Sequence, residues 1–208
     1  MVSYAQEGED LLLENILNFS KNGFFVDVGA HHPVRFSNTY KLYLQGWRGI
    51  NIDPAPGSMK KFETMRPEDI NLEMAIAASE KPMTYFIFND SALNTFDEEK
   101  KNKIIQNSSY KNISQIKVNT TTLEKVLNKY LPADVKIDFM NIDVENMELE
   151  VLKSNDWSKY RPNILLIENI KEDLREVLNS EITLLLEQYQ YKAVCKGFRS
   201  VLYKLVMN

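Results

Sequence analysis

The chain has 208 residues, of which 44% are hydrophobic and 26% charged, and its formal net charge is −4. This length and composition predict a single globular domain over 1–208, and the mild acidity argues against a nucleic-acid binder. No apolar run approaches the roughly 20 residues of a membrane-spanning helix. The lone Cys195 excludes an intrachain disulfide, and the acidic start does not resemble a signal peptide. We therefore expect a cytoplasmic protein that does not insert into a membrane.

Short apolar runs alternate with amphipathic stretches along the chain. The expected strands cover 24–28, 49–53, 70–76, 83–88, 116–120, 137–142, 163–167, 191–195 and 200–206. The expected helices cover 7–18, 38–45 (with Ser37 as N-cap), 58–65, 97–106, 122–130, a stretch from about 147, and 171–187. This alternation predicts a mostly parallel α/β sheet with helices on both faces. The last two strands form a hairpin, which adds an antiparallel strand.

The first expected strand carries an acid and a glycine at its carboxyl end. Asp27 lies within the apolar run 24–28, and Gly29 follows it. In open α/β sheets, ligands bind outside the carboxyl ends of the strands. Gly29 permits a close approach of the backbone, and Asp27 is placed to accept hydrogen bonds. The alternative is an ordinary turn that Asp27 caps.

The second expected strand also ends in an acid, Asp53. A carboxylate at this position binds ribose hydroxyls in nucleoside-binding folds. The alternative is a turn aspartate before Pro54. Together, Asp27 and Asp53 favour a nucleoside site.

The residues after Gly29 separate two classes of nucleoside. A dinucleotide needs the pattern G-x-G-x-x-G for its pyrophosphate, whereas here Gly29 is followed by Ala30, His31, His32 and Pro33. S-adenosylmethionine carries no phosphate, so this loop suits it better. An NAD-dependent oxidoreductase and a non-catalytic nucleoside-binding protein remain the alternatives.

Seven segments, in this order, resemble the FkbM-type methyltransferases. They are YAQEGED at 4–10, FVDVGA at 25–30, SNTY at 37–40, GWRGINIDP at 46–54, ALNTF at 92–96, IDFMNIDVE at 137–145 and PNILLIE at 162–168. The resemblance implies a Rossmann-like class I methyltransferase fold, a seven-stranded mostly parallel sheet with an antiparallel C-terminal strand. It also implies S-adenosylmethionine as cofactor and O-methylation of a hydroxyl, often on a sugar.

The resemblance also implies roles for single residues. Asp27, Gly29 and Ala30 would flank the methionine part of the cofactor, and Asp53 would hold the ribose. The remaining implied cofactor contacts are Ala75 and Ile76 near the adenine, and Gln6, Ser37 and Asn38 around the pocket. One position departs from the family pattern: Asn146 stands where a glycine is usual, although asparagine tolerates a left-handed backbone better than most residues.

Several polar residues are candidates for the reaction itself. Asp143 and Glu145 follow the strand at 137–142, and Glu168 follows the strand at 163–167. Asp143 is a candidate for contacting the methionyl amine, acting as base or binding a metal. Glu145 is a candidate for binding the acceptor, and Glu168 is a candidate for binding the acceptor or for catalysis. His32 is a further candidate base, because Pro33 restricts its backbone. Two carboxylates at a strand end do not establish a metal site, so a divalent metal stays open.

The irregular middle of the chain, 89–113, is a candidate acceptor-binding lid, and Asn94 within it a candidate acceptor contact. The sequence therefore predicts an S-adenosylmethionine-dependent O-methyltransferase. Its expected acceptor is a small polyhydroxylated molecule, a saccharide or a nucleotide sugar. The sequence does not indicate an oligomeric state.

Overall fold

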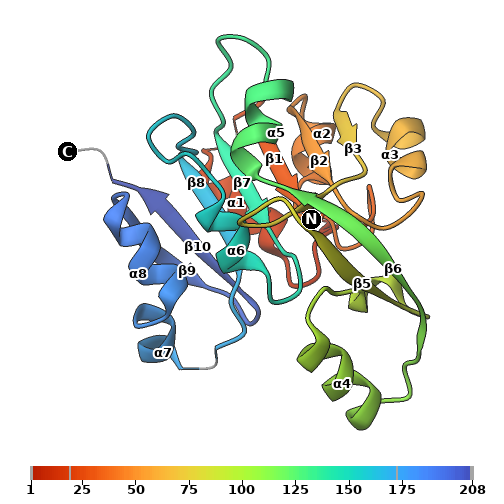
Figure 1. The fold of residues 1–208 in the computed structure, drawn as a ribbon. Helices are drawn as coiled ribbons and strands as arrows, with labels where there is room; N and C mark the ends of the chain where they lie inside the picture. The colour runs from red at the N-terminus through yellow and green to blue at the C-terminus, as the bar shows by residue number, and fades with distance from the viewer. Residues whose placement is uncertain (1, 19, 172, 207–208) are drawn as a thin grey trace.

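The computed structural model describes residues 2–18, 20–171 and 173–206, and Figure 1 shows their arrangement. The helices are α1 (Glu9–Ile16), α2 (Tyr40–Leu44), α3 (Met59–Met65), the 3₁₀ helix η1 (Ser91–Leu93), α4 (Glu98–Asn107), α5 (Leu123–Tyr130), α6 (Glu148–Lys153), α7 (Leu174–Leu178) and α8 (Glu181–Gln188). The strands are β1 (Phe24–Val28), β2 (Arg48–Ile52), β3 (Ile70–Leu72), β4 (Ala75–Ile76), β5 (Pro82–Phe88), β6 (Asn112–Thr121), β7 (Phe139–Ile142), β8 (Ile164–Glu168), β9 (Tyr191–Lys196) and β10 (Ser200–Leu205).

Seven strands form the main sheet, in the order β3-β2-β1-β7-β8-β10-β9. In this sheet, β3, β2, β1, β7 and β8 pair in parallel, each with its neighbour. Strand β10 is antiparallel to both of its neighbours, β8 and β9. This confirms the expected mostly parallel sheet with an antiparallel C-terminal strand. The strand order reverses between β1 and β7, so the crevice at their carboxyl ends is where ligands bind in such folds.

The main sheet has an apolar core on each face, because successive strand residues point to opposite sides. On one face, Val26 and Met140 pack with apolar residues of α5, α6 and α8. On the other, Phe25 and Phe139 pack with residues of α1 and α2. The strands are buried on both sides, which explains why they read as continuous apolar runs in the sequence.

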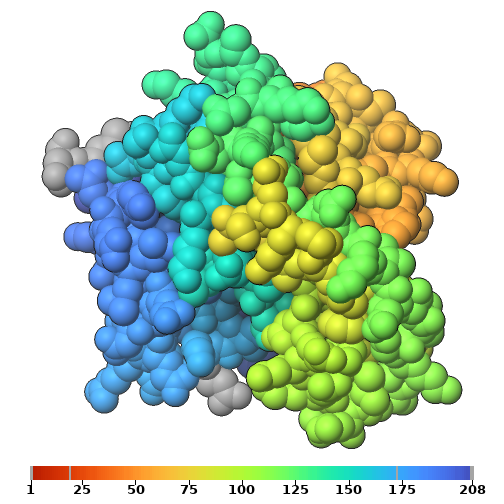
Figure 2. All heavy atoms as spheres, in the orientation of Figure 1, coloured from red at the N-terminus to blue at the C-terminus, as the bar shows by residue number. Residues whose placement is uncertain are grey.

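A second sheet, of β4, β6 and β5, projects from the first. Its β5–β6 hairpin carries η1 and α4 in the connection, and these elements form the lobe at the lower right of the space-filling view (Figure 2). The expected strand over 70–76 is therefore wrong as one element. β3 pairs with β2, while β4 pairs with β6. The chain changes sheets at Met74, whose N–H donates to the carbonyl of Asp53 at 3.2 Å.

Two expected helices also need correction. The expected helix over 171–187 is two helices, α7 and α8, because Ser180 is extended and its side chain caps α8 by accepting from the Thr183 N–H; Glu172 lies outside the described residues. The expected helix over 38–45 begins later, at Tyr40, although the Ser37 hydroxyl does accept a hydrogen bond from the Tyr40 N–H at 3.0 Å. Among the described residues, no helix is long and apolar enough to cross a bilayer.

Gly29 fixes the spacing of the two central strands. Its φ is +84°, and a Cβ built on it would overlap the carbonyl oxygen of Asp143, just beyond β7. The N–H groups of Gly29 and Ala30 both donate to the carbonyl of Ile52, at 2.9 and 3.0 Å. The glycine is therefore required first by the protein's own packing, not by the close approach of a ligand.

We predict that Gly29→Ala destabilises the fold far more than Gly8→Ala. Gly8 has nearly the same φ, +87°, but a Cβ there meets nothing within 4 Å. The left-handed backbone costs about 1–2 kcal/mol in either variant, and overpacking against Asp143 adds about 1–3 kcal/mol only in Gly29→Ala. Urea unfolding measures both losses, and equal losses would contradict this account of the β1–β7 contact.

Candidate functional site

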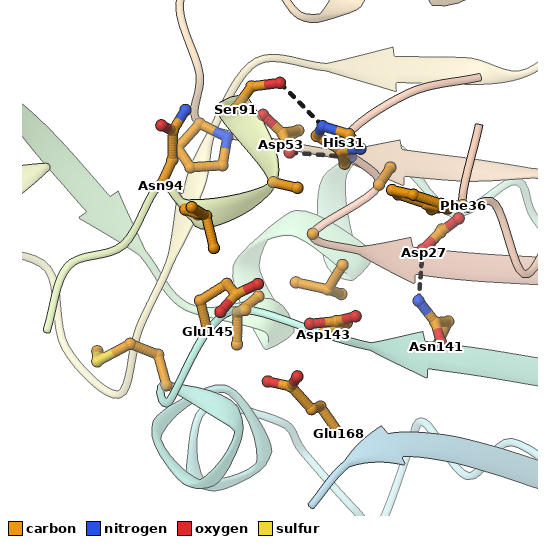
Figure 3. Close-up of a pocket in the computed structure, with 18 of the residues that line it drawn as sticks. Asp27, His31, Phe36, Asp53, Ser91, Asn94, Asn141, Asp143, Glu145 and Glu168 are labelled. Carbon is orange, nitrogen blue, oxygen red and sulfur yellow. Dashed lines mark hydrogen bonds between the residues drawn. The ribbon is translucent and has the colours of Figure 1, made fainter. Parts of the chain in front are cut away.

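A cavity of about 520 Å³ opens at the carboxyl ends of the central strands. Four neighbouring strands each bring one carboxylate to it: Asp27 in β1, Asp53 after β2, Asp143 after β7, and Glu168 at the end of β8. Figure 3 shows these side chains around one hollow, with Asp53 and His31 at one end and Glu145 and Glu168 at the other. The sheet topology alone brings these acids together.

Asp27 lies at the floor of the cavity and is 2% exposed. Its two carboxylate oxygens accept hydrogen bonds from the Thr39 hydroxyl at 2.6 Å and from the Asn141 amide at 2.8 Å. Burial raises the pKa of Asp27, while these hydrogen bonds and the charge of Arg66 oppose the rise. The neighbours thus orient the carboxylate and partly compensate its burial.

Arg66 stabilises the Thr39 hydroxyl that donates to Asp27. Its guanidinium is fully buried, donates to the Thr39 hydroxyl at 3.0 Å and pairs with Asp69 at 2.8 Å. It also lies over the ring of Phe25, 5.1 Å from the centroid. Sequence reasoning missed this residue, because an arginine at a helix end before a proline usually faces solvent.

Asp53 closes one end of the cavity and is held by the backbone. Its carboxylate accepts from the N–H of His31 at 3.0 Å and from the N–H of Ala55 at 2.8 Å. Burial raises its pKa, and the two backbone hydrogen bonds counteract the rise. Each oxygen retains a second lone pair, so the group can still accept from two ligand hydroxyls.

Of the two histidines, His31 lines the cavity and His32 does not. The His32 Nδ1 accepts from the N–H groups of Val34 and Arg35, at 3.1 and 3.0 Å, which folds its ring back onto its own loop. His31 has a φ of 52°, and its Nε2 lies 2.9 Å from the Ser91 hydroxyl. Burial lowers the pKa of both rings, which favours their neutral forms. Neither histidine lies beside Asp143 and Glu168, so the geometry does not favour the expected base role of His32.

Asn38 brings an amide to the cavity. Its Nδ2 donates to the Oδ1 of Asn141 at 3.0 Å, whereas its own Oδ1 is buried and without a hydrogen-bond partner. A buried carbonyl oxygen left in this way costs free energy until a donor reaches it. Gln6 and Ser37 line the same part of the cavity.

The wall beyond Asp53 is largely apolar. Ala75 and Ile76 of β4 line it together with Tyr85 and Phe96, whose rings lie 4.6 Å apart between centroids. Both β4 residues are buried, 2% and 6% exposed. This wall offers a flat aromatic ligand a contact surface without charge.

The expected lid segment contributes residues to the wall of the cavity. Residues of η1, α4 and the adjoining loops, including Ser91, Leu93, Lys100 and Tyr110, line it. Asn94 also lines it, but its side-chain oxygen accepts from the Phe88 N–H at 2.8 Å. The side chain of Asn94 therefore also shapes the loop.

The lid is fastened to the turn after β7. The Thr95 hydroxyl donates to the carbonyl of Glu145 at 2.9 Å, and the Asn146 amide donates to the Asp97 carboxylate at 2.8 Å. Lys100 forms an ion pair with Glu145. Asn146 has a φ of 80°, so it forms a left-handed turn while its side chain contacts the lid.

The acidic end of the cavity holds carboxylates at close range. One oxygen each of Asp143, Glu145 and Glu168 lie within 4.8 Å of one another. Burial, together with Glu168 and Glu148, raises the pKa of Asp143 well above its usual value. Burial also raises the pKa of Glu168, and burial with Glu168 raises the pKa of Glu148 to about 7.

The methyltransferase FkbM domain profile matches residues 27–193 of the chain. The chain belongs to the FkbM methyltransferase family. The match spans β1 to β9 and includes all four carboxylates at the strand ends. A comparison with curated proteins gives no match.

Two solved structures resemble the chain at low identity. One is a precorrin-6Y C5,15-methyltransferase from Geobacter metallireducens, with 8% identity, a TM-score of 0.46 and coverage of 98% of this chain and 93% of that one. The other is the fibrillarin pre-rRNA processing protein of Methanococcus jannaschii, with 13% identity, a TM-score of 0.44 and coverage of 89% and 67%. At this level of similarity, neither structure bears on substrate or mechanism.

In this FkbM-family chain, nearly all of the residues singled out from the sequence border one cavity. They are Gln6, Asp27, Gly29, Ala30, Ser37, Asn38, Asp53, Ala75, Ile76, Asn94, Asp143, Glu145 and Glu168. His32 is the exception. Asn141 and Lys100 also line the cavity, although sequence reasoning did not single them out. Asn141 is a polar residue inside an apolar strand, and this is the signal that could have identified it.

We predict that Glu148→Gln stabilises the protein at about pH 8 and changes little at about pH 4.5, in metal-free buffer. The folded-state pKa of about 7 exceeds the ordinary 4.5, so the native state binds the proton more tightly. The free energy of unfolding consequently falls as pH rises through this window, by up to about 3 kcal/mol from this group. Urea unfolding at both pH values measures the difference. Glu150→Gln, on the same helix but 41% exposed, is the control. An equal effect of Glu148→Gln at both pH values would contradict the burial of its charge.

Proposed function

We propose that this chain transfers a methyl group from S-adenosylmethionine to a hydroxyl of a small polyhydroxylated acceptor, a sugar or a nucleotide sugar. The observation that carries the proposal is the two-ended cavity of an FkbM-family protein. Nucleoside-type contacts lie at one end and a group of carboxylates at the other.

The end with Asp27 and Asp53 suits the cofactor. Asp53 accepts from the ribose hydroxyls with its free lone pairs. The unpartnered Oδ1 of Asn38 and the nearby carboxylate of Asp27 offer acceptors to the methionyl ammonium. The apolar wall of Ala75 and Ile76 receives the adenine.

The loop after β1 supports this cofactor over a dinucleotide. The next helix, α2, begins only at Tyr40, and the N–H groups of Gly29 and Ala30 already donate to Ile52. No helix N-terminus therefore follows directly on β1 to bind a pyrophosphate. Residues 29–39 are all described and contain no helix, which argues against the NAD-dependent alternative.

The end with Asp143 and Glu168 suits the acceptor. S-adenosylmethionine supplies an electrophilic methyl group, which passes to the acceptor oxygen as the C–S bond breaks and sulfur keeps the electron pair. Asp143 and Glu168 take the hydroxyl proton, since raised pKa values make them better bases than exposed carboxylates. Glu145 and Asn94 contact the acceptor from the turn and the lid. Positioning the two reactants supplies much of the acceleration.

We predict that Asp53→Asn weakens binding of S-adenosylhomocysteine at least tenfold, about 1.4 kcal/mol. The amide retains the shape of the side chain but replaces one acceptor oxygen with a donor, so it holds two ribose hydroxyls less well. Isothermal titration calorimetry of the wild type and the variant measures this loss.

Asp134→Asn is the matched control, because Asp134 is exposed and lies on the loop that enters β7 at the opposite edge of the sheet. It should bind like the wild type. Parallel titration with NAD should give no heat. If the folded wild type bound NAD but not S-adenosylhomocysteine, the proposed cofactor would be wrong.

A further inference from the structure

The acidic end of the cavity contains more negative charge than the described protein groups around it neutralise. Asp143 and Glu145 lie there after β7, and Glu168 lies there at the end of β8. Glu148 of α6 does not line the cavity, but it is close enough to raise the pKa of Asp143. Lys100 of the lid forms an ion pair with Glu145, and its charge opposes the rise in the pKa of Asp143, Glu148 and Glu168. The charge of Arg199 also opposes the rise in the pKa of Glu168. Like charges this close disfavour one another unless a cation or protons intervene.

Glu168 adds an independent observation. Glu168 is only 7% exposed, and its Oε2 is buried without a hydrogen-bond partner. Figure 3 shows its carboxylate pointing toward Asp143 and Glu145. A buried carboxylate oxygen aimed at two other carboxylates lacks the partner that its burial requires.

We propose that Asp143, Glu145 and Glu168 bind one divalent cation of the hard, oxygen-preferring class, Mg²⁺ or Mn²⁺. One oxygen from each residue lies within 4.8 Å of the others, so small side-chain rotations bring all three onto one ion. Carboxylate oxygens are the ligands these ions prefer, and Mg²⁺ commonly keeps several water positions open.

The open positions face the cavity, where adjacent hydroxyls of the acceptor replace water. A bound cation orients such hydroxyls and eases loss of a proton from one of them. This role rests on the proposed function, whereas binding of the ion does not. The site therefore favours acceptors with two neighbouring oxygens over isolated alcohols.

Lys100 gives the proposal a second test, because its ammonium competes with the ion for Glu145. In Lys100→Met the competing charge is gone, and the ion should bind at least threefold more tightly. If Lys100 were instead the sole permanent counter-ion of the acids, its loss would destabilise the fold without creating affinity for a cation.

The closing experiment titrates Mn²⁺ into the metal-free full-length protein, without cofactor, and follows free Mn²⁺ by electron paramagnetic resonance. We expect one site, displaced by excess Mg²⁺. Affinity should fall at least tenfold in Glu168→Gln and stay unchanged in Glu150→Gln, whose side chain lies on the outer part of α6 and pairs with Lys153. Circular dichroism confirms that each variant is folded.

No Mn²⁺ binding by the wild type at millimolar concentration, or equal binding by wild type and folded Glu168→Gln, would overturn the proposal. Should Glu168→Gln not fold, Lys100→Met decides: tighter binding supports the site, and unchanged or absent binding overturns it. Calorimetry with S-adenosylhomocysteine in chelator keeps the two proposals apart. Cofactor binding without Mn²⁺ binding refutes only the cation site, and the converse refutes only the cofactor.

Discussion

The structure depends on one electrostatic constraint: four neighbouring strands deliver a carboxylate each to the same edge of the sheet. Like charges in a partly buried crevice repel, so each one needs its own compensation. The Asp27 carboxylate accepts a hydrogen bond from the Thr39 hydroxyl, which itself accepts from Arg66. The Asp53 carboxylate accepts from two backbone N–H groups. Among the described residues, Lys100 acts on both Asp143 and Glu168, and Arg199 acts on Glu168 as well, yet burial still raises the pKa of both acids. The acidic end of the cavity is therefore suited to a charged or strongly donating ligand.

The second sheet matters because it closes the crevice that the first sheet creates. Its lid segment reaches the turn after β7 through Thr95 and Lys100, while Ser91 meets the loop after β1 through His31. One insertion thus touches both ends of the cavity. A change in its position would alter both ends of the cavity together.

The sheet, its antiparallel end and the positions of the strand-end acids follow from the sequence, because buried parallel strands leave long apolar runs and a glycine marks the tight contact at Gly29. Other features depend on contacts between distant segments. The change of sheet at Met74 and the burial of Arg66 need partners that no local pattern names. The orientation of the His32 ring also depends on contacts, because two backbone N–H groups of its own loop donate to its Nδ1.

We propose that one end of the cavity receives a nucleoside and the other an acceptor beside carboxylates. A crystal structure with S-adenosylhomocysteine tests it most directly. We expect the ribose hydroxyls to bind Asp53, the adenine to lie against Ala75 and Ile76, and the sulfur to point toward Asp143. A nucleoside bound elsewhere, or one in this cavity with its ribose away from Asp53, would contradict it.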